Sequence, residues 1–64
     1  MTVILRATML GAPLYYRGSA HAHEWSPDQT QAATFGSESA ARADLGSSPP
    51  VYSHLIVRAR AVTP

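Results

Sequence analysis

The chain has 64 residues, which is enough for one small domain and too few for a second. It contains no cysteine, so disulfides and thiolate metal sites are excluded. The formal net charge of +1 argues against a strongly acidic nucleic-acid mimic and against a strongly basic nucleic-acid binder. All five basic residues are arginine, which suits interfaces, although a GC-rich coding sequence explains the same bias.

Residues 2–9 predict a strand, because apolar side chains recur there at every second position. The residues on this apolar face are Val3, Leu5, Ala7 and Met9. Gly11-Ala12-Pro13 has the composition of a turn, and residues 14–17 resume an extended pattern, so we expect a hairpin. Gly18 ends or bulges its second strand. Residues 18–24 show no clear period and form either an exposed loop or an extension of that strand.

Ser26-Pro27-Asp28-Gln29 has the pattern of a helix start, with a capping residue, a proline at the first position and a capping box. We expect a helix over residues 27–35 that Gly36 ends in a left-handed conformation. A second short helix is expected over residues 38–45, capped by Ser37 and closed by Gly46. One helix kinked at Gly36 is the alternative.

Residues 47–50 predict a loop, and residues 51–62 predict a long last strand with alternating apolar and polar positions. The element order indicates an α+β fold in one domain spanning residues 1–64. Its three-stranded antiparallel sheet (β-β-α-β) carries one kinked helix or two short helices on one face. We expect Trp25 at the edge of a core formed by Leu5, Ala7, Phe35, Ala41, Leu45, Leu55 and Val57.

A pattern W-S-x-D-x-x-x-A-x-x-F-x-S-x-x-x-A runs through residues 25–41. It resembles a pattern of small strand-strand-helix-strand accessory proteins of bacteriophages and prophages. Some proteins of that size and source, the anti-CRISPR proteins among them, inhibit bacterial defence by binding a surface of the target machinery. The resemblance therefore implies a phage-type inhibitor or modulator. Capping and packing explain the same seven residues, which are Trp25, Ser26, Asp28, Ala32, Phe35, Ser37 and Ala41.

Three histidines raise the question of a metal site. His21 and His23 would face the same side of an extended segment next to Glu24, and His54 could join them from the last strand. Structural zinc needs four ligands at constrained spacing, so we expect an exposed polar loop, no metal and no cofactor. The chain has no Gly-x-Ser-x-Gly elbow and no glycine-rich phosphate loop, so we expect no enzymatic activity.

The sheet face away from the helix is the predicted binding surface. Its candidate partner-binding residues are Arg6, Arg58 and Arg60, flanked by Arg17, Tyr15 and Tyr16. Arginine and tyrosine are enriched in protein interfaces, which favours binding to a larger protein or nucleoprotein complex. The same residues also suit single-stranded nucleic acid. A solvated outer face and a homodimer paired through an open sheet edge are further alternatives.

The N-terminal region bears on localisation. No apolar run reaches the roughly 20 residues that a membrane span needs, so we expect no membrane partner. Ala20-His21-Ala22 has the small-x-small pattern of a signal cleavage site. However, no positive residue precedes the apolar stretch, and Arg6 interrupts it. We therefore expect an uncleaved cytoplasmic protein.

Overall fold

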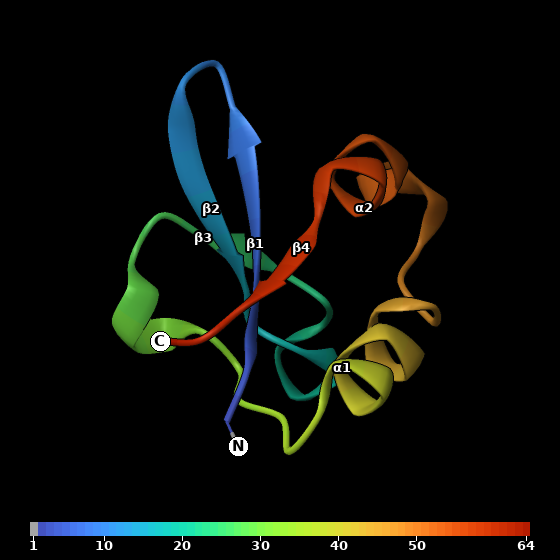
Figure 1. Ribbon diagram of the computed structural model, residues 1–64. Coiled ribbons are helices and arrows are strands. Elements are labelled where there is room, and N and C mark those ends of the chain that lie inside the picture. Colours follow the sequence, from blue (N-terminus) through green and yellow to red (C-terminus); the bar gives the residue numbers. More distant parts are fainter. Residues whose placement is uncertain (1) are drawn as a thin grey trace.

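The computed structural model describes residues 2–64 and has an antiparallel sheet with the strand order β3-β2-β1-β4 (Figure 1). The strands are β1 (Ile4–Met9), β2 (Ala12–Tyr16), β3 (Trp25–Ser26) and β4 (Arg60–Val62). The helices are α1 (Glu38–Leu45) and α2 (Ser53–Arg58), with 3-10 turns η1 (Ser19–His21), η2 (Gln29–Gln31) and η3 (Pro50–Tyr52). The predicted α+β class is confirmed, but the sheet has four strands, not three.

The predicted N-terminal hairpin is confirmed, although its turn lies earlier than expected. Met9 pairs with Ala12, so the turn consists of Leu10 and Gly11, whose φ angles are 53° and 81°. Two positive φ angles are typical of the type I′ turn, whose twist matches that of the flanking strands. Pro13, which was expected in the turn, lies within β2 opposite Thr8.

The predicted helix over residues 38–45 is confirmed as α1. The Ser37 hydroxyl accepts a hydrogen bond from the backbone N–H of Ala40 at 3.2 Å, which caps the helix start. Ala41 and Leu45 are buried, as the spacing of four predicts. Gly46 follows the helix in a right-handed conformation, with φ of −63°.

The predicted helix over residues 27–35 is wrong. Ser26 belongs to β3, and the Asp28 carboxylate accepts from the backbone N–H of Thr30 at 2.9 Å, which caps only the short turn η2. The chain then becomes extended, and Phe35 forms a β-bridge to Val3. The bridge places the Phe35 ring against the core. The free energy gained by this burial and pairing outweighs the weak helical preference of residues 29–34, which are polar or alanine. Gly36 therefore caps no helix, and the single kinked helix is also wrong.

The predicted strand over residues 51–62 is wrong except at its end. Pro50 starts η3, α2 follows at once, and only residues 60–62 join the sheet as β4. The alternation misled because it runs across two elements: Leu55 is buried on one face of α2, whereas Ala59 is buried after the helix ends, where the chain is already extended. Val57 was expected in the core, yet it is 84% exposed because it lies on the far side of α2.

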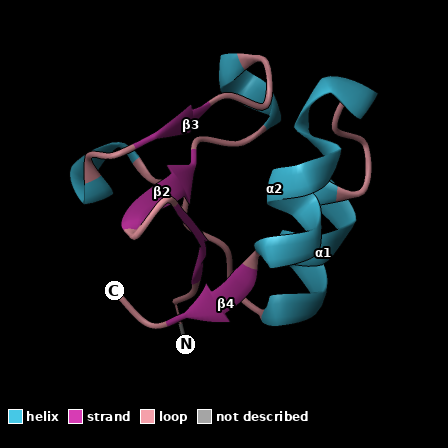
Figure 2. Cartoon of the chain, turned by 90° about the horizontal axis from the view of Figure 1, so that it is seen from above, coloured by secondary structure: helices cyan, strands magenta, loops and turns pink. Residues whose placement is uncertain are grey.

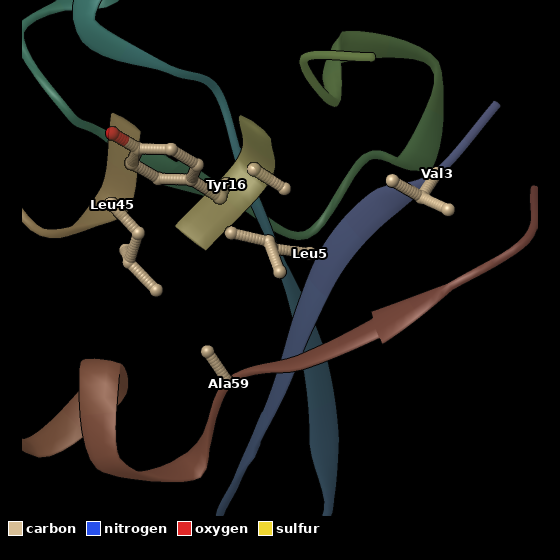
Figure 3. Close-up of a cluster of buried hydrophobic side chains, with 6 residues drawn as sticks. Val3, Leu5, Tyr16, Leu45 and Ala59 are labelled. Carbon is tan, nitrogen blue, oxygen red and sulfur yellow. The ribbon is translucent and has the colours of Figure 1, made fainter. Parts of the chain in front are cut away.

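The core lies between the sheet and the two α-helices, which share one side of the sheet (Figure 2). Its central cluster contains Val3, Leu5, Tyr16, Ala41, Leu45 and Ala59 (Figure 3). Trp25, Phe35, Ile56 and Ala61 are partly buried against this cluster. Leu5, Ala7, Ala41, Leu45 and Leu55 are buried as predicted, and Trp25 lies at the edge as predicted.

Candidate functional site

Three of the predicted binding residues surround one open groove. Arg6 comes from β1, Arg60 lies directly opposite it on β4, and Arg58 ends α2. The groove has a volume of about 340 Å³, and Thr8 and Val57 complete its lining. We call these five residues the arginine groove.

The groove exists because β4 is shorter than the strand it pairs with. Register pairing between β1 and β4 ends at Arg6 and Arg60, whereas β1 continues to Met9. α2 lies beside the upper part of β1 where a longer β4 would continue (Figure 1). The chain changes from α2 to β4 at Ala59, which leaves room next to Thr8. Arg58 precedes Ala59 in α2, and Arg60 follows it in β4.

The other two arginines are neutralised by local ion pairs. Arg17 Nη1 lies 3.2 Å from the Glu24 carboxylate, and Arg42 Nε lies 2.9 Å from that of Glu38. Within residues 2–64, no acidic side chain forms a salt bridge to an arginine of the groove.

The two remaining carboxylates are also engaged away from the groove. Asp28 accepts hydrogen bonds from Thr30, and Asp44 accepts from Tyr16 and Ser19. The guanidinium group stays charged at any physiological pH, so the groove carries three positive charges that the described chain leaves uncompensated. Such a site attracts an anionic group.

The remaining predicted binding residues differ in their placement. Tyr15 pairs with Arg6 across the strands, so it shares the outer face with that arginine and is half-buried. Arg17 is held by Glu24 and does not line the groove. Tyr16 was expected at the surface, but it is completely buried. Its side chain points to the opposite face from Tyr15, because successive strand residues alternate.

Tyr16 is instead the centre of a polar network. Its hydroxyl lies 2.7 Å from Asp44 Oδ2 and 2.6 Å from His23 Nδ1. A phenol has one proton and a carboxylate only accepts, so Tyr16 donates to Asp44 and accepts from the protonated Nδ1 of His23. Burial raises the pKa of Tyr16 to about 12, and the Asp44 carboxylate adds to this effect.

Asp44 links α1 to the segment that follows β2. Besides the Tyr16 hydroxyl, it accepts from the Ser19 hydroxyl at 2.8 Å and from the Ser19 backbone N–H at 3.1 Å. Burial alone raises the pKa of Asp44, but the hydrogen bonds from Tyr16 and Ser19 outweigh that effect and lower it. These hydrogen bonds hold α1 against the segment that follows β2.

These two shifts predict how stability depends on pH. The folded chain binds a proton at Asp44 less readily than the unfolded chain, so this stabilisation is complete above about pH 4 and is lost on acidification. The folded chain keeps the Tyr16 proton to a higher pH than the unfolded chain does. The stabilisation that Tyr16 contributes is therefore lost as the pH rises from about 10 toward 12. We expect the melting temperature to fall on both sides. Tyr16→Phe should reduce the alkaline fall, and an unchanged fall would contradict this assignment.

The three histidines have different surroundings in the fold. His23 joins the Tyr16 network, His21 Nδ1 lies 3.4 Å from Arg17 Nη2, and His54 belongs to α2. In the described part of the chain, no three histidine, aspartate or glutamate side chains are grouped so that they could hold a metal ion.

The Tyr16–His23–Asp44 network could not be found from the sequence, since Asp44 lies 28 positions after Tyr16.

Across residues 2–64, no helix has the length and apolar character needed to cross a membrane. Comparisons of the chain with protein-family models, with curated proteins and with solved structures gave no match.

Proposed function

We propose that this chain is a non-enzymatic binding protein that attaches to an anionic surface of a larger protein or nucleoprotein complex through the arginine groove. The observation that supports it is the segregation of charge. Each of the four acidic side chains is engaged elsewhere, and the three arginines of the groove lack a salt-bridge partner within residues 2–64. Placing like charges together costs stability, so their collection around one groove favours a use in binding.

Arginine is well suited to such a contact. Its planar fork binds carboxylates and phosphates through two parallel hydrogen bonds, and it loses its hydration more easily than lysine. Arg6 and Arg60 are fixed by strand pairing and Arg58 by the end of α2, so their backbones are ordered before binding. Pre-ordering reduces the entropy lost on association and favours specific docking.

A phage-type inhibitor or modulator is the class of binding protein that the resemblance in residues 25–41 supports. In the fold these residues form β3, η2 and the start of α1, and none of them lines the groove. The resemblance therefore bears on the scaffold, whereas the arginine groove supplies the contact with a partner.

A single-stranded nucleic acid is the second candidate ligand for the same arginines. Phosphate groups match the charge of the groove, and Tyr15 lies on the same face beside Arg6. This candidate predicts a steep loss of affinity as salt is raised, with a slope set by the number of phosphate contacts.

Removing two of the three positive charges of the groove should weaken its binding of anionic probes. We expect Arg58→Gln combined with Arg60→Gln to weaken binding of a fluorescent oligoglutamate peptide at least tenfold, measured by anisotropy at low salt. The matched control is Arg17→Gln combined with Arg42→Gln, which removes the same charge from two exposed ion pairs. Equal losses in the two double variants would mean that net charge, not the groove, binds the peptide. A labelled oligothymidine tests the second candidate in the same assay.

A further inference from the structure

The hairpin tip exposes a large apolar side chain that the fold does not use. Leu10 is fully solvent-exposed and has a φ of 53°. Left-handed backbone disfavours leucine, and the first position of a type I′ turn normally takes asparagine, aspartate or glycine. Leucine here is thus unfavourable for the turn and contributes nothing to the core. An outlier of this kind points to a role in binding.

A second exposed apolar residue lies within the groove itself. Val57 is 84% exposed and lines the groove beside the arginines. Leu10 follows the groove residue Thr8 by two positions, which is about 7 Å along an extended chain. The hairpin tip and α2 lie at the same end of the molecule (Figure 1). Val57 therefore lies beside the arginines within the groove, and Leu10 extends the apolar surface at the hairpin tip, two positions beyond Thr8.

We infer that the groove and the hairpin tip together recognise an acidic protein segment that carries an apolar side chain beside its carboxylates. The carboxylates pair with the arginines, and the apolar side chain contacts Val57 and Leu10. This inference rests on the proposed function and names the class of partner.

A protein segment fits this surface better than a nucleic acid does. Nucleobases bind through stacking on aromatic faces, whereas Val57 and Leu10 are aliphatic and Tyr15, the aromatic residue beside Arg6, is half-buried. Tyr16 is buried, Trp25 and Phe35 pack against it with ring centroids 5.3 Å and 6.4 Å away, and none of these three aromatic residues lines the groove. A second copy of the chain is disfavoured as well, because it would bring the same uncompensated arginines.

Two probe peptides of equal charge test the inference. Both carry glutamates throughout, with leucines interspersed in one and serines at the same positions in the other. We expect the wild-type chain to bind the leucine peptide about tenfold more tightly, which corresponds to partial burial of one aliphatic side chain. Leu10→Asn combined with Val57→Thr should remove this preference, so that the two peptides bind the double variant with similar affinity.

The controls separate an anchoring role from a structural one. Leu10→Asn places a favoured residue in the turn, so the melting temperature should rise while leucine-peptide binding falls. Val51→Thr changes an exposed valine that does not line the groove and should preserve the tenfold preference. The inference is overturned if wild type binds both peptides equally, if the double variant keeps the preference, or if oligothymidine binds more tightly than either peptide. Failure of both peptides to bind would instead reject the proposed function.

Discussion

Tyr16→Ala is expected to remove a large share of the free energy of unfolding and to lower the melting temperature steeply. The Tyr16 side chain is completely buried and packs against the rings of Trp25 and Phe35. Truncating a buried aromatic residue to alanine costs about 3–5 kcal/mol. A domain of this length has a total free energy of unfolding of about 3–10 kcal/mol, so the substitution removes much or all of it.

Tyr15→Ala is the matched control, since it removes the same side chain from the neighbouring, half-buried position. We expect Tyr15→Ala to retain a cooperative unfolding transition in circular dichroism, whereas Tyr16→Ala should show none or one at much lower temperature. Tyr16→Phe separates the two roles of the residue, because it keeps the ring and removes only the hydroxyl. Similar melting temperatures for Tyr15→Ala and Tyr16→Ala would contradict the packing described above.

Asp44→Ala is expected to lower the free energy of unfolding by about 2–3 kcal/mol, because it breaks three hydrogen bonds to a charged acceptor. The carboxylate accepts from the Tyr16 hydroxyl and from two groups of Ser19. Glu38→Ala, on the same helix, breaks only an exposed ion pair and should cost well under about 1 kcal/mol. Urea denaturation measures both losses, and equal losses would show that the network contributes no more than a surface ion pair.

Local signals in the sequence were sufficient for the hairpin and for α1. Alternation in residues 2–9 and the Ser37 cap describe interactions between residues close in the chain, and both features occur where they were expected. The capping pattern at Ser26 was misleading because two patterns compete there. Ser26 pairs with Tyr15 in the sheet, and Asp28 takes the role of the cap. Tertiary pairing decided between them, which no local pattern reveals.

The burial of Tyr16 could not be predicted for a similar reason. Adjacent tyrosines on a strand point to opposite faces, and the sequence does not say which one faces the core. That choice depends on Trp25 and Phe35, which reach Tyr16 from segments that were expected to be a loop and a helix.

The sequence predicted a shared sheet face for Arg6, Arg58 and Arg60, but it did not predict a groove. Arg6 and Arg60 share a face through β1–β4 pairing, as the alternation indicated. Arg58 reaches the same groove from the end of α2, not from a strand. The groove itself, with Val57 at its wall, depends on the change from helix to strand at Ala59, which the alternating pattern of residues 51–62 conceals.

Mapping the bound peptide on the protein by NMR tests the central claim most directly. Titrating the leucine-containing glutamate peptide into ¹⁵N-labelled protein should shift the backbone amide signals of Thr8, Val57, Arg58 and Arg60, together with those of the hairpin tip. The signals around Arg17 and Arg42, which lie in ion pairs away from the groove, should stay in place. Shifts centred on those two arginines, or no shift at saturating peptide, would contradict binding at the arginine groove.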